Sequence, residues 1–189
     1  MMHHKIGSLW CLATALIVLP SCSVDKLARL DQVSPNEAIA VARFRVIYNG
    51  EKVTKNNYVY FNSTYGGEHA FKDDEYMFFK LPAGKNNIQN VCHSLVQHHF
   101  EPDELTFNLA GGGTINYLGD ITFVWDGMNS AGATGMALLS PIASMYLTGG
   151  GTKVSVESHP ASARDALRQR YGVDRVVTPS LLKVKTRHQ

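Results

Sequence analysis

The sequence predicts a mostly β fold, an antiparallel β-sandwich with one C-terminal α-helix. Several short segments alternate apolar and polar residues with the period of two that is typical of a half-buried strand. Turn residues separate these segments, and one segment near the end of the chain has the period of a helix instead. The sequence shows no internal repeat, so we expect residues 37–189 to form a single domain.

The first expected strand covers residues 42–48, where every second side chain is apolar. Asn49 and Gly50 follow it, and Asn-Gly between two apolar stretches is a strong hairpin signal because both residues tolerate positive φ. A second apolar stretch starts at Val53, and residues 57–63 are rich in β-branched and aromatic side chains. These residues predict a hairpin followed by a third strand.

The middle of the chain predicts further strands. One ends at Leu81 and leads into a turn at residues 82–84, where Pro presets φ and Gly supplies the left-handed position. Residues 88–99 fit either a helical stripe or a strand, and we interpret them as a strand because their neighbours are strands. Residues 152–158, TKVSVES, alternate again and predict another strand.

Three glycines, Gly111–Gly113, raise the question of a phosphate-binding loop. Such a loop requires a Lys and a Ser or Thr after the glycines and then a helix, whose N-terminus binds the anion. No Lys follows here, and residues 114–125 are apolar, aromatic and β-branched, which is typical of a strand. We therefore interpret the glycines as a turn between two strands.

Residues 162–171 are expected to form the single helix. Ser162 can cap it, with Asp165 three residues later in the spacing of a capping box, and Gly172 can end it. Residues 176–185 are then expected to close a sheet. One side of the helix is apolar and should face the core; it is formed by Ala163, Ala166, Leu167 and Tyr171.

The start of the chain has the order of a secretory signal peptide. Lys5 precedes an apolar run at residues 9–19, which is short for a bilayer span of about 20 residues. The run ends in Leu19-Pro20-Ser21-Cys22, which resembles the lipobox of bacterial lipoproteins. The resemblance implies that residues 1–21 are removed and that Cys22 receives the lipid. The alternative is an ordinary signal peptide or membrane anchor with an incidental Cys22.

The resemblance also implies a location. Residues 22–36 would be a lipidated tether, and Ser23 after the cysteine implies the outer membrane, with the protein facing the periplasm. Of the three cysteines, Cys11 lies in the signal and Cys22 is the anchor, so Cys92 has no partner for an intramolecular disulfide. The partners expected are the membrane, through the lipid, and an envelope protein. A formal charge of +2 gives no electrostatic case for nucleic acid.

A second resemblance covers most of the mature chain. Residues Leu81–Gly84, Tyr117–Ile121 and Asp165–Tyr171 follow one another as in PEGA-type or carboxypeptidase-regulatory-like modules of bacterial lipoproteins. This resemblance implies a β-sandwich of uncharacterised function. The family carries no accepted catalytic residues, so no catalytic role is transferred to this chain. The stretch of residues 127–152 departs from the family pattern.

The only candidate metal ligands that cluster in the sequence are four neighbouring residues and one upstream histidine. Their side chains are of the types that hold zinc or copper, but the spacing fits no common structural site. We therefore expect no metal and no cofactor, with these residues interpreted as polar groups beside a buried thiol. The five residues are His69, Cys92, His93, His98 and His99.

Catalytic signals are also weak. No G-x-S-x-G elbow occurs, so no nucleophilic serine is singled out. Residues 73–75 form an acidic run that we interpret as a solvated turn, and Asp120 after Gly119 is interpreted as a buried structural acid. We therefore expect no catalytic residues.

Residues 127–152 carry no charge, and their centre is apolar but interrupted by Gly, Ser and Pro. Two interpretations remain open: core strands joined by small-residue turns, or an exposed apolar loop that contacts a partner or the bilayer surface.

Together, the sequence features predict a lipid-anchored envelope protein that is a non-enzymatic structural or interaction module. A metal- or small-ligand-binding lipoprotein is the alternative, followed by an envelope hydrolase.

Overall fold

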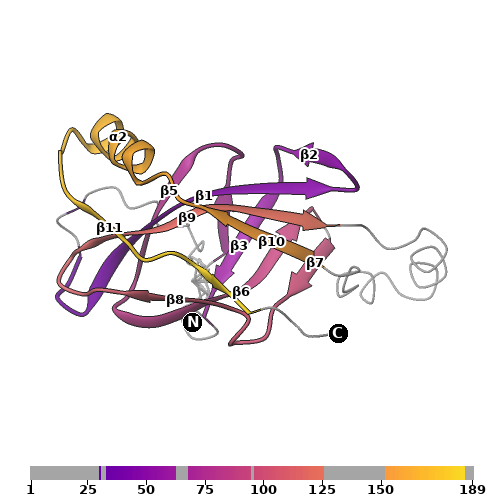
Figure 1. The fold of residues 1–189 in the computed structure, drawn as a ribbon, viewed down its shortest axis with the longest axis horizontal. Coiled ribbons are helices and arrows are strands. Elements are labelled where there is room, and N and C mark those ends of the chain that lie inside the picture. The colour runs from indigo at the N-terminus through magenta and orange to yellow at the C-terminus, as the bar shows by residue number, and fades with distance from the viewer. Residues whose placement is uncertain (1–29, 31–32, 63–67, 95, 126–151, 186–189) are drawn as a thin grey trace, which may run out of the picture.

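The computed structural model describes residues 30, 33–62, 68–94, 96–125 and 152–185. The predicted signal peptide, Cys22 and residues 127–151 of the uncharged stretch lie outside the described residues. Within them the chain forms two stacked β-sheets and one helix near the C-terminus, which confirms the predicted β-sandwich (Figure 1).

The first sheet is built around two long central strands that run parallel to each other. On the side away from its central partner, each central strand pairs antiparallel or parallel with two shorter strands, one after the other along its length. The sheet is therefore mixed rather than purely antiparallel. Its strands are β1 (Glu37–Tyr48) and β9 (Ile115–Trp125) at the centre, β5 (Tyr76–Pro82) and β2 (Glu51–Val53) beside β1, and β10 (Thr152–Glu157) and β11 (Val177–Pro179) beside β9.

The second sheet is antiparallel throughout its described pairs. The region predicted as one strand at residues 88–99 forms parts of two strands that meet at Ser94, whose φ is 54°. The predicted strand at residues 176–185 is divided between the two sheets. In sheet order the strands are β12 (Lys183–Val184), β8 (Leu105–Leu109), β6 (Gly84–His93), β3 (Asn57–Phe61) and β4 (Glu68–Phe71), with β7 (Val96–His99) also paired to β6.

The predicted turns join these strands. Asn49 and Gly50 connect β1 and β2 with φ of 52° and 80°, which confirms the hairpin. The turn after Leu81 leads from β5 in the first sheet to β6 in the second, and Gly84 has a φ of 96°. The glycines at 111–113 likewise lead from β8 in the second sheet to β9 in the first.

The main core lies between the two sheets. It is rich in aromatic rings: Phe44 of β1 lies 6.3 Å from Phe123 and 6.5 Å from Phe61, and Phe61 lies 4.9 Å from Phe79, as measured between ring centroids. All four side chains are buried. Burial of each contributes about 1.5–3 kcal/mol, so this layer supplies stability in the absence of a disulfide within the described residues.

A second apolar cluster lies on the outer face of the first sheet, under helix α2 (Pro160–Tyr171) (Figure 1). Ala163 and Leu167 are the buried residues of the helix, and Ala166 and Tyr171 pack at the margin, as predicted for its apolar side. Leu30 packs against the same cluster, so chain preceding β1 reaches the helix-bearing face.

The helix begins earlier than predicted. It starts at Pro160, with His159 at the N-cap position and no side-chain capping hydrogen bond, so the predicted cap at Ser162 is wrong. Proline is well suited to the first position of a helix because its φ is already helical and its missing N–H would be unpaired there. The predicted end is confirmed: Gly172 has a φ of 68° and donates its N–H to the carbonyl of Arg168.

The parallel pair of β1 and β9 contains a bulge. Val41 pairs with Tyr117 and Ala42 pairs with Gly119, so Leu118 is an extra residue in β9. Gly119 has a φ of 116°, which side chains rarely allow. A bulge reverses the alternation of side chains along a strand. As a result, Tyr117 and Asp120 both lie on the outer face of the sheet, although they are three residues apart.

Replacing Gly119 by Ala tests the bulge. An added Cβ would lie 2.5 Å from Cγ1 of Val156 and 3.2 Å from the carbonyl oxygen of Glu157, in addition to the strained φ. We expect Gly119→Ala to lower the free energy of unfolding by about 3 kcal/mol, measured by urea denaturation of a chain that starts at Ser23.

Gly112 provides the matched control, because its φ is 69° but nothing lies within 4 Å of an added Cβ. Gly112→Ala should cost only about 1 kcal/mol. Equal costs at the two positions would show that β10 does not press against the bulge.

Candidate functional site

The glycine loop is not available to bind phosphate. Gly112 donates its N–H to the carbonyl of Pro35 at 2.9 Å, and Gly113 donates to the carbonyl of Glu37 at 3.1 Å. A phosphate-binding loop needs such N–H groups free to face the anion. Strand β9 rather than a helix follows the glycines. The loop is therefore a turn between β8 and β9, as the sequence predicts, and it also anchors the start of β1.

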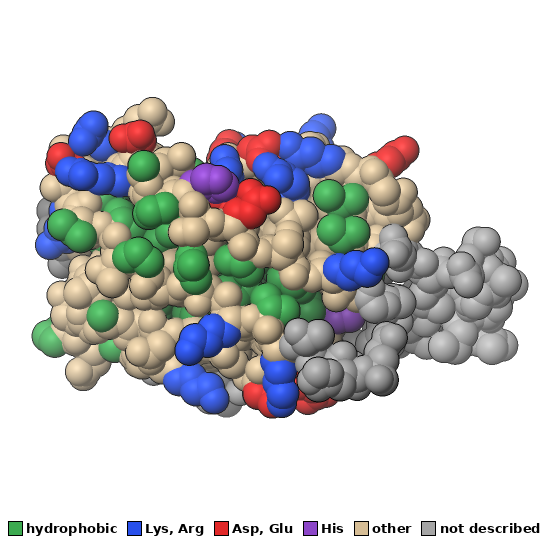
Figure 2. Space-filling model, in the orientation of Figure 1, with side chains coloured by type: hydrophobic (Ala, Val, Ile, Leu, Met, Phe, Trp, Pro, Cys, Tyr) green, Lys and Arg blue, Asp and Glu red, His purple; other side chains and the backbone are tan. Residues whose placement is uncertain are grey.

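A row of polar side chains crosses the outer face of the first sheet beside α2. The strand register places Tyr76 of β5 opposite Arg43 of β1, Arg43 opposite Asp120 of β9, and Asp120 opposite Glu157 of β10. The chain then turns at His159 into the helix. Figure 2 shows charged side chains and a histidine gathered on this side of the molecule. We call Arg43, Tyr76, Tyr117, Asp120 and His159 the Asp120 cluster.

Asp120 is the centre of the cluster and is 7% exposed. Its Oδ1 accepts a hydrogen bond from the Tyr117 hydroxyl at 2.8 Å. Its Oδ2 accepts one from Nδ1 of His159 at 2.8 Å and another from the Arg43 guanidinium. Both carboxylate oxygens are therefore occupied by side chains of the protein.

The cluster also holds the chain where it enters α2. The Tyr117 hydroxyl accepts a hydrogen bond from the backbone N–H of His159 at 3.0 Å, while it donates to Asp120. His159 is thus bound through its backbone and its ring. The helix has no side-chain cap, and these bonds instead fix the residue that precedes it.

Electrostatics favour one protonation state for the surrounding groups. Burial lowers the pKa of Arg43, but the hydrogen bond and charge of Asp120 outweigh this effect, so the pKa lies above its usual value. Burial raises the pKa of Tyr117 strongly, and Asp120 raises it further because a second negative charge would be repelled. A neutral tyrosine beside an ion pair is therefore stable over the physiological range.

Tyr76 completes the cluster at the edge of the sheet. The Arg43 guanidinium lies over its ring, 5.2 Å from the centroid. Its buried hydroxyl makes no hydrogen bond of standard geometry with another described residue, although Asp120 and Tyr117 lie near enough to influence its pKa. Burial is the main reason that this pKa is raised.

A carboxylate that orients a histidine is one part of a Ser–His–Asp triad, so the pair of Asp120 and His159 has catalytic precedent. A triad also needs a nucleophile hydrogen-bonded to the other ring nitrogen. Within the described residues no hydrogen bond to Nε2 of His159 is found. The contacts that are present join β9, β1 and the start of α2 to one another.

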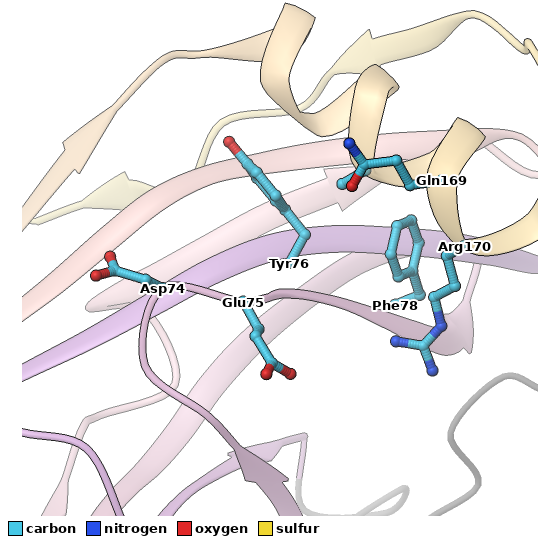
Figure 3. Close-up of a pocket in the computed structure, with 7 residues that line it drawn as sticks. Asp74, Glu75, Tyr76, Phe78, Gln169 and Arg170 are labelled. Carbon is cyan, nitrogen blue, oxygen red and sulfur yellow. The ribbon is translucent and has the colours of Figure 1, made fainter.

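An open groove of about 400 Å³ lies between β5 and α2, next to the cluster. Figure 3 shows Tyr76 and Phe78 rising from β5 toward the helix, with Gln169 above them and the Arg170 side chain coming down from the helix beside Phe78. The Arg170 guanidinium lies 5.4 Å from the centroid of Phe78, and no carboxylate pairs with it among the described residues. Residues Asp74, Glu75 and Ala166 complete the lining.

Residues 73 and 74 lie in a turn, as predicted, but the turn is salt-bridged rather than solvated, and the Asp73 side chain is only 5% exposed. Asp74 pairs with Arg45 at 2.6 Å and also with Lys52, and Asp73 pairs with Lys52 at 2.6 Å. Hydrogen bonds from Lys52 and then Arg45 hold the pKa of Asp74 well below its usual range. These acids neutralise cations on β1 and β2 and do not form a pair of catalytic carboxylates.

The candidate metal ligands make hydrogen bonds and ring contacts with other parts of the protein. His93 bonds Asn57 at 3.0 Å and His99 bonds Asn90 at 2.8 Å, each through Nδ1. The His69 ring packs against Phe79, with 5.1 Å between centroids. His98 packs against Phe100, and Cys92 is buried. In the part of the chain that the structure describes, no three His, Cys, Asp or Glu residues come together as a metal site.

The sequence identified one member of the cluster. Asp120 is a buried, hydrogen-bonded acid, as predicted. Arg43 and His159 were missed as its partners because they come from β1 and the start of α2, and Tyr117 was missed because in a regular strand a residue three positions away faces the other side of the sheet. Gly119 inside a strand pattern was the available signal, since such a glycine often marks a bulge.

Comparisons of the chain with protein-family models, with curated proteins and with solved structures find no match.

The structural role of Asp120 can be measured with a matched pair of substitutions. Asp120→Asn keeps the shape of the side chain but removes the charge that Arg43 and His159 face. We expect it to lower the free energy of unfolding by about 2 kcal/mol. The measurement is urea denaturation at neutral pH.

Asp74→Asn is the control, because Asp74 also pairs with an arginine but is 45% exposed. Exposed ion pairs contribute about 0.2–1 kcal/mol, so this change should cost less than 1 kcal/mol. A larger cost for Asp74→Asn than for Asp120→Asn would contradict the role given to the cluster.

Proposed function

We propose that this chain is a lipid-anchored envelope protein whose β-sandwich is a non-enzymatic structural or interaction module. Two lines of support are independent of each other: the lipobox-like Leu19–Cys22 at the start of the chain, and the way the sandwich uses its polar groups. The outer membrane is the proposed location, with the domain in the periplasm, because Ser23 rather than Asp follows the cysteine.

The anchor would hold the domain close to the membrane. Leu30 packs in the apolar cluster under α2, only eight residues after Cys22. Eight residues of fully extended chain span at most about 28 Å. The free tether therefore ends at Leu30, and a partner would have to lie at or near the membrane surface.

The observation that carries the non-enzymatic proposal is the occupancy of Asp120. Both of its oxygens accept hydrogen bonds from the protein, and its histidine partner is also held through the backbone. A group that is committed in this way supports the packing of α2 on the sheet. A general base needs a free position toward its substrate.

No helix among the described residues is both long and apolar enough to cross a membrane.

Binding of a small ligand is the second candidate function, and the groove beside α2 favours it. Two aromatic rings, Tyr76 and Phe78, line the groove next to Arg170. This combination suits a flat ring that carries a carboxylate, since the ring can lie against Tyr76 and the acid can pair with the guanidinium, while Phe78 is 3% exposed and forms the floor of the groove.

The lipid anchor can be tested at Cys22. We expect native protein to incorporate labelled palmitate and to partition into detergent, because acyl chains on the thiol and amino group hold it in the membrane. Cys22→Ser should abolish palmitate labelling and block removal of residues 1–21, and a chain that starts at Ser23 should stay in the aqueous phase. Ser21→Ala is the matched control, since it keeps a small residue before the cysteine and should leave labelling intact. Mass spectrometry that finds an unmodified Cys22 in the mature protein would refute the proposal.

The groove can be tested with phenylacetate as a probe. If the groove binds aromatic acids, the nuclear magnetic resonance spectrum of phenylacetate should show a saturation-transfer difference signal in the presence of the protein. Arg170→Ala should remove this signal. Arg168→Ala is the control, because Arg168 lies on the same helix but pairs with Asp174 at 3.1 Å. A signal that survives in Arg170→Ala would exclude the groove as the binding site.

A further inference from the structure

Strand β10 lies at an edge of the first sheet. All six of its residues pair with β9 on one side, from Thr152 opposite Trp125 to Glu157 opposite Asp120. No strand among the described residues pairs with its other side. An edge strand offers a row of backbone N–H and C=O groups to another strand, and proteins usually block such an edge with charge or cover it.

The side chains of β10 divide cleanly between the two faces of the sheet. Val154 and Val156 are half-buried and pack against the core between the sheets. Lys153, Ser155 and Glu157 are exposed on the outer face. Figure 2 shows hydrophobic side chains visible in the middle of the face that carries this edge. The core is therefore incompletely closed here.

The sequence of this edge is self-complementary. In residues 152–158, Thr-Lys-Val-Ser-Val-Glu-Ser, the two residues at equal distance from Ser155 always match in kind or are opposite in charge. Val154 matches Val156, and Thr152 matches Ser158. Lys153 on one side of Ser155 corresponds to Glu157 on the other.

We propose that a second copy of this chain binds along β10, with the two β10 strands antiparallel about a twofold axis at Ser155. This arrangement places Lys153 of each copy opposite Glu157 of the other and joins the two first sheets into one. Residues that are directly opposite in an antiparallel pair share a face, so the valines meet on the core side. The interface is isologous, as the common twofold dimers are.

Charge fixes the register of this pairing. Opposite charges across a strand pair are stabilising, and like charges destabilise it by a similar amount. Moving the centre to Val154 would place Lys153 opposite Ser155, and moving it to Val156 would place Glu157 opposite Ser155. Only the centre at Ser155 forms both ion pairs. A lysine on an edge strand usually disfavours pairing with another strand. Lys153 instead favours a partner strand that places a glutamate opposite it.

Strand β5, another edge of the same sheet, has no such match. An antiparallel pairing centred on Phe79 would place Phe78 opposite Lys80 and would bring no opposite charges together. The self-complementary pattern of β10 is therefore not shared by β5.

The twofold axis is perpendicular to the joined sheet. Both α2 helices then lie on the same side of it, together with the Leu30 residues that pack beneath them. The two chains would therefore leave the dimer toward one side, which is compatible with attachment of both to one surface. The pairing itself does not depend on how the chain is anchored.

Cysteine cross-linking in whole cells tests the geometry on the full-length protein. Ser155→Cys places two thiols directly opposite each other across the axis, so copper–phenanthroline oxidation should convert most of the protein to a disulfide-linked dimer on a non-reducing gel. Lys153→Cys is the control on the same face of the same strand. Its two thiols would lie four residues apart along the strands, about 13 Å, and should cross-link far less.

Charge reversal tests the register independently. Glu157→Lys sets Lys153 against a lysine and should reduce the cross-linking rate of Ser155→Cys roughly tenfold. Lys153→Glu combined with Glu157→Lys restores opposite charges and should restore the rate. All three side chains are exposed, so the fold should tolerate the changes, and circular dichroism would check this.

Three results would overturn the proposal: no dimer with Ser155→Cys in folded protein, equal cross-linking at positions 153 and 155, or a charge-swapped variant that remains as slow as Glu157→Lys. Each would show that β10 does not meet a second β10 in this register.

Discussion

The bulge at Leu118 and Gly119 turns Tyr117 and Asp120 toward the same face of the first sheet, and the helix-bearing side of the protein depends on this geometry. Without the extra residue, side chains three positions apart would face opposite sides of the sheet. With it, Asp120 lies beside Arg43 and reaches His159, which leads into α2. Glycine is required because Val156 and the backbone of Glu157 leave no room for a Cβ.

The same constraint determines how the polar groups relate to function. Asp120 and His159 resemble part of a catalytic triad when viewed as a pair, yet the carboxylate also receives Arg43 and Tyr117. The glycine loop is likewise committed, since its N–H groups bind the chain before β1. We therefore propose that recognition occurs at the groove between β5 and α2 and at the edge of β10 that no described strand pairs with.

Local patterns in the sequence predicted the fold class, most strands, the turns at Asn49 and Gly111–Gly113, and the end of the helix at Gly172. These features depend on neighbouring residues and on the φ that each residue tolerates. The parallel pairing of β1 with β9 was not predictable in this way. The two strands are far apart in the chain, and they become neighbours only because the connections from β5 to β6 and from β8 to β9 pass between the two sheets. The start of α2 was misplaced because tertiary bonds to His159, rather than a local cap at Ser162, fix it.

The most direct test of the central claim, that the Asp120 cluster holds α2 on the sheet, is residue-resolved hydrogen exchange of native protein and Asp120→Asn. The account predicts that amides of α2 lose protection in the variant, while amides of β3 and β6 in the second sheet keep most of theirs, because regions of a protein can open separately. Unchanged protection of α2, or an equal loss across both sheets, would contradict it.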